Sequence, residues 1–155
     1  MESTRVFTLA EQEYHTLHRS LLDTDSTVFK VRAMSDAKVS LLRVPSNFKA
    51  PSYEIVVGAE SNTRTVIHSK AAGGDQIVSQ VNTPDILSFT ELRSFWVSWN
   101  NGTVRIGKGE TVGLNEILSY VDPQPAFRRH VHSIAVASGQ GIAEWELGRP
   151  FGSRK

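Results

Sequence analysis

Short segments in which apolar and polar residues alternate dominate the chain from residue 27 onward. In the first of these segments, Phe29 and Val31 are out of phase with the polar Lys30 and Arg32. Alternation with a period of two is typical of a β-strand that buries one face and exposes the other. Segments with this pattern recur between turn residues. The predicted strands are residues 27–33, 39–44, 53–57, 63–68, 95–99, 103–106, 132–137 and 142–147.

The connections between these strands are mostly too short for crossover helices, so neighbouring strands are expected to pair antiparallel. Asn100, Asn101 and Gly102 separate two of the strands and tolerate the positive φ angles of a tight hairpin turn. Many short strands with frequent turns favour a sandwich or a barrel. The sequence therefore predicts an all-β fold, an antiparallel β-sandwich of jelly-roll-like type.

The N-terminal segment fits two interpretations. Ala10, Tyr14 and Leu17 have the spacing of one helical face, whereas Phe7 and its neighbours fit an edge strand of the sandwich, which we favour. The predicted organisation is one domain with an N-terminal segment, a sandwich and a frayed tail, at residues 1–25, 26–148 and 149–155.

Composition is consistent with one soluble domain of 155 residues, of which 39% are hydrophobic and 21% charged. The 17 basic and 16 acidic residues give a net charge of +1, which argues against a dedicated nucleic-acid or membrane-surface binder. The absence of cysteine excludes disulfides, thiol catalysis and cysteine-based zinc sites. With no apolar run of transmembrane length and no signal-like segment, we expect a cytoplasmic protein or one released without a signal peptide.

Two glycine-containing segments invite comparison with nucleotide loops. Gly139-Gln140-Gly141 follows an apolar strand, but a nucleotide loop needs a helix behind it and more parallel strands downstream. Residues 142–147 are predicted to form a strand instead, so a turn is favoured. Residues 107–110 lack the glycine spacing of a P-loop and are interpreted as a hairpin turn.

Metal-ligand patterns are weak. His130 and His132 would lie on one side of a strand, as in some metal sites, but a solvated pair at a sheet edge is the favoured interpretation. Residues 23–26 open like a calcium loop without its later glycine and glutamate, and a turn entering a strand is favoured there.

The aromatic segment at residues 95–99 is the richest in the chain. Phe95, Val97 and Trp99 share one face by alternation, which predicts core packing. Trp96 is on the other face and is the candidate for a partly exposed ring that stacks on a ligand.

An ordered set of segments resembles the farnesoic acid O-methyltransferase-like domain. The segments are FKVRA (29–33), DAKVSLL (36–42), YEIVVG (53–58), NTR (62–64), FWVSW (95–99), GTVRIGKG (102–109), LSYVDP (118–123) and EW (144–145). The family name implies S-adenosylmethionine-dependent methyl transfer to a sesquiterpenoid acid in arthropod hormone synthesis. Similar domains occur in invertebrate lectin-like and innate-recognition proteins, which implies a compact sandwich whose loops carry the function.

Two loops depart from the family pattern. The family usually has Gly-Trp-Gly after Gly58 and again in the late loop, whereas this chain has Ala59-Glu60-Ser61 and Gly139-Gln140-Gly141. If those tryptophans stack on a sugar in relatives, this protein binds a different ligand or binds more weakly.

From these observations we predict a non-enzymatic binding domain that recognises carbohydrate. Sugar sites use planar polar groups, often beside a ring or a calcium ion, and Glu54, Asn62, Arg64 and Glu144 supply such groups near the family's loops. These glutamates and Glu146 are expected to face solvent. The predicted partner is a glycan or small polar ligand, without nucleic acid, membrane insertion or a required cofactor; calcium and a homo-oligomer remain open. The alternatives are the methyltransferase and a protein-interaction or self-assembly module.

The geometry of this site depends on strand direction. Loops 58–63 and 138–143 each leave the C-terminal end of an apolar strand. If the two strands run in the same direction, Asn62, Arg64 and Glu144 converge at one end of the sandwich. In the alternative, Asn62 caps a turn, while Arg64 and Glu144 form a surface ion pair worth under about 1 kcal/mol.

Overall fold

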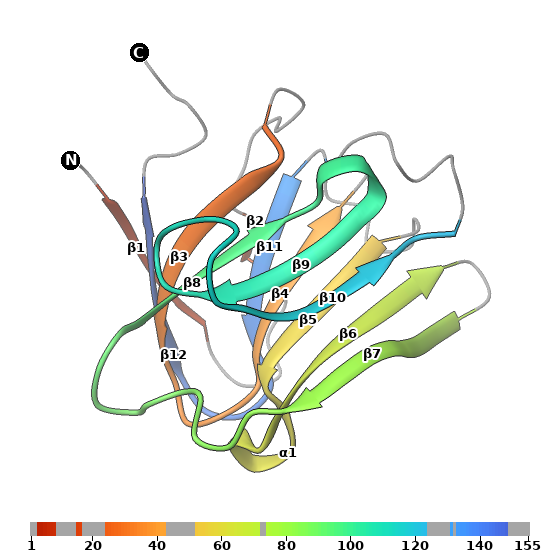
Figure 1. The fold of residues 1–155 in the computed structure, drawn as a ribbon. Helices are drawn as coiled ribbons and strands as arrows, with labels where there is room; N and C mark the ends of the chain where they lie inside the picture. The colour runs from red at the N-terminus through yellow and green to blue at the C-terminus, as the bar shows by residue number, and fades with distance from the viewer. Residues whose placement is uncertain are drawn as a thin grey trace.

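The computed structural model describes residues 3–8, 15–16, 24–42, 52–71, 74–123, 131 and 133–148. Within these ranges, two six-stranded sheets pack face to face (Figure 1). Sheet A has the order β1 (Ser3–Thr8), β12 (Ala143–Gly148), β3 (Ser26–Arg32), β8 (Arg93–Ser98), β9 (Thr103–Lys108) and β10 (Glu116–Val121). Sheet B has the order β2 (His15–Thr16), β11 (Ser133–Ser138), β4 (Ala37–Leu42), β5 (Ser52–Gly58), β6 (Arg64–Ala71) and β7 (Gly74–Asn82).

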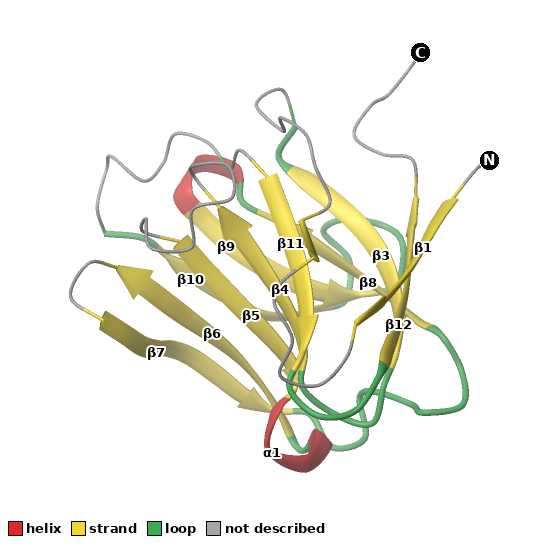
Figure 2. Cartoon of the chain, turned by 180° about the vertical axis from the view of Figure 1, so that it is seen from behind, coloured by secondary structure: helices red, strands yellow, loops and turns green. Residues whose placement is uncertain are grey.

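All described strand pairs are antiparallel, which confirms the predicted antiparallel β-sandwich. The hairpin between β8 and β9 is also confirmed, because Asn101 has φ 54° and Gly102 has φ 79°. Figure 2 shows that the described helical segments are short and lie at the ends of the sandwich. They are α1 (Ala59–Asn62) and a 3-10 turn at Asn100–Gly102.

The core lies between the inner faces of the two sheets. Phe29 on β3 packs against Phe95 on β8 and Trp145 on β12, with ring centroids 5.8 and 5.7 Å away. Val31, two residues along β3, is fully buried on the same face, as the alternation predicts. Each such side chain stabilises the fold by about 1.5–3 kcal/mol.

After the N-terminal segment, two described strands were not among the predicted ones, and both lack a simple alternation. In β7 most side chains are exposed on both faces of the strand. In β10 only Leu118 is buried, and its pairing with β9 is irregular between Glu116 and Leu118. A strand with solvent on both faces leaves no period of two in the sequence.

The N-terminal segment supplies an edge strand to each sheet. β1 pairs with β12 at the edge of sheet A, and β2 pairs with β11 at the edge of sheet B. Ala10, Tyr14 and Leu17, which carried the helical alternative, lie outside the described residues, as does the tail at 149–155. The predicted domain limits stay predictions.

The prediction of a partly exposed Trp96 is wrong, because its side chain is fully buried. It points to the outer face of sheet A, but the connection between β9 and β10 returns over it. The indole N–H of Trp96 donates a hydrogen bond of 2.7 Å to the carbonyl of Leu114 in that connection. Gly107 on β9 lies against the ring, and a Cβ atom there would be 2.3 Å from it.

Candidate functional site

The loops at residues 58–63 and 139–142 lie at the same end of the sandwich. β5 and β11 both pair antiparallel with β4, so they run in the same direction. The turn between β3 and β4 links the two loops, since the Asp36 N–H donates to the Gly58 carbonyl and the Gly139 N–H donates to the Asp36 carbonyl. The two strands therefore run in the same direction, as the predicted site required, and both loops reach one end of the sandwich.

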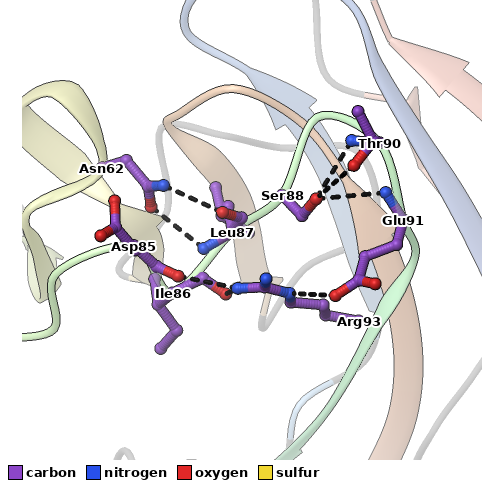
Figure 3. Close-up of polar contacts among 8 residues, drawn as sticks. All are labelled: Asn62, Asp85, Ile86, Leu87, Ser88, Thr90, Glu91 and Arg93. Carbon is purple, nitrogen blue, oxygen red and sulfur yellow. Dashed lines mark hydrogen bonds and ion pairs between the residues drawn. The ribbon is translucent and has the colours of Figure 1, made fainter.

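Asn62 lies in this end but binds backbone. Its Nδ2 donates to the carbonyl of Leu87 at 2.9 Å, and its Oδ1 accepts the N–H of Leu87 at 3.0 Å (Figure 3). Asn62 has φ 65° and is preceded by Glu60 and Ser61, which also have positive φ. The tight backbone of α1 thus aims the amide at the connection between β7 and β8.

That connection, residues 83–92, is held at several points. Arg93 donates to the carbonyls of Asp85 and Ile86 at 2.7 and 3.2 Å, and its Nε donates to Glu91 at 3.0 Å (Figure 3). The hydroxyl of Ser88 accepts the N–H of Glu91 at 3.2 Å. The loop is therefore tied at several points to α1 and to the start of β8.

Arg64 begins β6 and does not contact Glu144. Its Nη1 donates to Gln80 at 2.7 Å, and its Nε lies 3.5 Å from a carboxylate oxygen of Glu60. That Nε is buried and makes no hydrogen bond, so the Glu60 contact is an ion pair only. The alternative in which Arg64 and Glu144 form a surface ion pair is therefore wrong, since Glu144 pairs with Arg32 and Arg5.

Glu54 lies on the outer face of sheet B, where Ser40 and His68 are its neighbours on β4 and β6. It is nonetheless buried, with 5% of its surface exposed, so the expectation that it faces solvent is wrong. Lys70 Nζ is 3.5 Å from Glu54 and 2.9 Å from Asp75, and Asp75 also bonds His68 Nδ1 at 2.9 Å. These side chains form a charged network across β5, β6 and β7.

Burial raises the pKa of the Glu54 carboxyl above its ordinary value, although Lys70 and His68 act against this shift. Burial acts to lower the pKa of Lys70, but its hydrogen bond to Asp75 and the charge of Glu54 give a net increase. The pKa of Asp75 is lowered overall: burial acts to raise it, and hydrogen bonds from Lys70 and His68 outweigh that effect.

Glu144 lies on the outer face of sheet A and is also buried, with 7% exposed, which again contradicts the expected solvent exposure. Glu146, two residues along β12, is half-buried. One Glu144 oxygen accepts both Nε and Nη2 of Arg32, at 2.9 and 2.7 Å. The other oxygen is 3.3 Å from Nε of Arg5. The carboxylate is held by two guanidinium groups from β1 and β3.

Two exposed phenylalanines neighbour the ion pair of Glu144 and Arg32, one through β1 and one through Arg32. Phe7 is opposite Glu144 in the β1–β12 register and is 58% exposed. Phe89, in the connection 83–92, is 54% exposed, and its ring centroid is 5.9 Å from the guanidinium carbon of Arg32. Arg32 Nη1 also donates to the Phe89 carbonyl at 2.9 Å. We call Arg5, Phe7, Arg32, Phe89 and Glu144 the Glu144 patch.

The structure therefore distributes the four predicted site residues over three places. Asn62 and Arg64 are at the end of the sandwich, Glu54 is on the outer face of sheet B and Glu144 on that of sheet A. Arg5 and Arg32, the partners of Glu144, were not among the residues predicted from the sequence. The polar phase of β3 indicates an outward Arg32, but nothing local in the sequence pairs β3 with β12.

The described residues contain no group of three or more His, Cys, Asp or Glu side chains that could hold a metal ion. His130 and His132 lie outside the described residues. The expected turn entering β3 is present, since Asp25 precedes the strand and accepts a hydrogen bond of 2.7 Å from Asn100.

The loop at residues 139–141 connects β11 to β12 and is followed by a strand, as predicted. Within the described part of the chain, the helical segments have four and three residues, so no helix N-terminus stands behind a glycine-rich loop. The described residues therefore do not form a glycine-rich loop followed by a helix, the arrangement expected of a Rossmann-type S-adenosylmethionine site. No helix among the described residues has both the length and the apolar character needed to cross a membrane.

Comparison with known proteins gives one family and a group of solved structures with the same fold. The sequence model of a family described as farnesoic acid O-methyl transferase matches residues 10–150. Among curated protein sequences, none matches the chain.

Solved structures similar to this chain are β-sandwiches. The galectin LEC-6 of Caenorhabditis elegans has a TM-score of 0.53 and 14% identity, over 92% of this chain and 96% of that one. The carbohydrate-binding module CBM66 of Bacillus subtilis has a TM-score of 0.59 and 8% identity, over 96% and 84%. A β-glucanase of Bacillus licheniformis has a TM-score of 0.53 and 9% identity, over 96% and 79%. At these identities, the likeness establishes the jelly-roll sandwich fold.

Proposed function

The chain belongs to the farnesoic acid O-methyl transferase family, and we propose that it is a non-enzymatic glycan-binding domain that uses the Glu144 patch. One observation carries this proposal: a buried carboxylate is bonded to Arg32, the exposed Phe7 is its partner in the β1–β12 register, and the exposed ring of Phe89 lies against Arg32. Planar polar groups beside a ring are the combination that a sugar requires, because a pyranose has an apolar face and a rim of hydroxyls.

The polar groups retain capacity for a ligand. A guanidinium has five N–H donors, and three of the nitrogen atoms of Arg32 direct one bond each to Glu144 or Phe89. The Glu144 oxygen nearest Arg5 has a long contact of 3.3 Å to a side chain that is 57% exposed. A sugar hydroxyl can donate to that oxygen while an adjacent hydroxyl accepts from Arg32.

The patch is also preorganised. Glu144 and Arg32 are direct neighbours in the β12–β3 register, and Phe89 is on the connection that Asn62 and Arg93 hold. A site that is ordered before the ligand arrives loses less conformational entropy on binding. The shared fold with a galectin and a carbohydrate-binding module supports the same function.

The proposal centres on Glu144 among the predicted residues. Asn62 and Arg64 direct their polar groups to Leu87, Gln80 and Glu60, and ligand binding by these two residues and by Glu54 stays a prediction. Glycan binding is favoured over methyl transfer because, among the described residues, no glycine-rich loop is followed by a helix that could receive S-adenosylmethionine.

The test is a glycan array with the whole chain, repeated with a calcium chelator, followed by titration of the best glycan. Phe89→Ala should weaken binding at least tenfold, about 1.4 kcal/mol, with an unchanged melting temperature. Glu144→Gln should weaken binding to a similar extent, and it should also lower the melting temperature, because it removes a buried charge that two guanidinium groups hold. The matched control is Val112→Ala, which trims an apolar side chain that is 42% exposed in the β9–β10 connection. Chelation should have no effect. An array without binding, or equal affinity in Phe89→Ala and wild type, would contradict the proposal.

A further inference from the structure

One lateral side of the sandwich is formed by the last strands of both sheets, β7 and β10. β7 pairs with β6 on one side, and no described strand pairs with its other edge. The two strands are joined by a hydrogen bond of 3.1 Å from the Ser79 hydroxyl to the Ser119 carbonyl. In Figures 1 and 2, β7 forms the outer border of the sandwich.

This side lacks two of the features that keep sheet edges apart, charged residues and proline. Residues 76–82 of β7 and 117–121 of β10 contain no charged residue and no proline. Ile77, Val81 and Val121 are exposed at 52, 37 and 59%. Free edges in monomeric proteins usually carry lysine or proline, because unpaired N–H and C=O groups otherwise recruit another strand. β7 does have one register shift relative to β6, between Ile77 and Ser79. The residues before and after this shift pair regularly with β6.

We propose that this side binds a second copy of the same chain, with β7 pairing antiparallel to β7 across a two-fold axis. The two copies then form one continuous sheet, and the apolar side chains of β7 and β10 are buried beside the axis. Such an interface uses the same surface on both subunits.

The charge of Asp75, near the start of β7, favours the antiparallel arrangement. Asp75 is half exposed at the start of the strand. In an antiparallel pair centred between Val78 and Ser79, Asp75 lies opposite the neutral Asn82. A parallel pair in register would place two Asp75 carboxylates side by side, which is unfavourable.

A second copy is favoured over a different protein as the occupant. Partners are usually selected by complementary charges across an interface, and residues 76–82 offer none. A neutral edge with exposed Ile77 and Val81 can pair with a second copy of itself, because no like charges within residues 76–82 would repel each other.

The arrangement leaves the Glu144 patch free. β1, β12 and β3 are at the opposite side of sheet A from β10. If the proposed function holds, the dimer therefore presents two glycan sites and gains avidity on a multivalent surface. The dimer itself does not depend on glycan binding.

The first experiment is sedimentation velocity of the whole chain without glycan, from about 1 to about 100 μM, a range in which weak dimers dissociate. Wild type should approach twice the chain mass of 17.2 kDa as concentration rises. Ile77→Lys combined with Val121→Lys should stay monomeric. The control is Met34→Lys combined with Ile142→Lys, which adds the same charge at exposed apolar residues outside β7 and β10 and should still dimerise.

A second measurement needs no variant. Amide hydrogen exchange in residues 76–82 should slow at the higher wild-type concentration, while exchange in β1 stays the same. Wild type that remains monomeric, a dimer in the β7–β10 variant, or exchange in 76–82 that is independent of concentration would overturn the proposal. Pairing with a strand of another protein instead would appear as a monomer in the purified chain.

Discussion

Tyr53 on β5 of sheet B donates a buried hydrogen bond of 2.5 Å to the carboxylate of Asp122, which follows β10 of sheet A. Both residues are almost fully buried, and the ring of Tyr120 packs against Tyr53 at 5.9 Å. Burial, together with the hydrogen bond to Asp122, raises the pKa of the Tyr53 hydroxyl far above its ordinary value, so it remains a donor at all physiological pH. This bond joins the two sheets.

Tyr53→Phe should lower the free energy of unfolding by about 1–3 kcal/mol, because it removes a donor from a buried carboxylate. Urea denaturation measures this loss. Tyr120→Phe removes a hydroxyl from the neighbouring ring and should cost much less. Equal effects of the two substitutions would show that the Tyr53–Asp122 bond is not a major contributor.

Asn62→Asp should destabilise the protein by about 1–3 kcal/mol, because a carboxylate oxygen would face the Leu87 carbonyl in place of a donor. Aspartate tolerates the positive φ of Asn62, so the backbone is not the cause. Asn101→Asp is the matched control, since Asn101 also has positive φ and is exposed in the β8–β9 turn. A thermal melt should shift for Asn62→Asp only; equal shifts would contradict the role of the Leu87 contact.

Glu54→Gln should change the pH dependence of stability in a defined direction. The pKa of Glu54 is higher in the folded state than in the unfolded state, so the folded state binds the proton more tightly. As the pH rises and Glu54 loses this proton, the free energy of unfolding therefore falls. The variant avoids this loss and should gain stability relative to wild type between acid and neutral pH. Urea titrations at several pH values measure the difference.

Asp75→Asn should change the pH dependence of stability in the opposite direction to Glu54→Gln. The folded pKa of Asp75 is lowered, so its contribution is present above the unfolded pKa and is lost as pH falls through the folded value. Wild type should exceed this variant in stability at neutral pH and lose that advantage in acid. The same direction of change in both variants would contradict the assignment of the network.

Gly107→Ala should destabilise the sandwich by about 1–3 kcal/mol, because the new methyl group would overlap the ring of Trp96. Either the ring or the β9–β10 connection must move, which should alter the tryptophan fluorescence. Unchanged fluorescence and stability would show that the ring is not confined by Gly107.

Features that depend on residues close together in the chain could be predicted from the sequence. Alternation within β3 directs Phe29 and Val31 to the core, since successive side chains of a strand point to opposite faces. Asn101 and Gly102 form the hairpin turn because these residue types tolerate positive φ. Such local preferences were sufficient for the fold class and for most of the strands.

The burial of polar and aromatic residues, and their partners, depends instead on how distant strands pack together. Trp96 has the phase of an outward residue but is covered by a connection that returns over the sheet. Glu144 meets Arg32 across 112 positions of sequence, through a strand pairing that no local pattern encodes. The candidate site arises from contacts between distant strands, whereas alternation reports only the face on which each side chain lies.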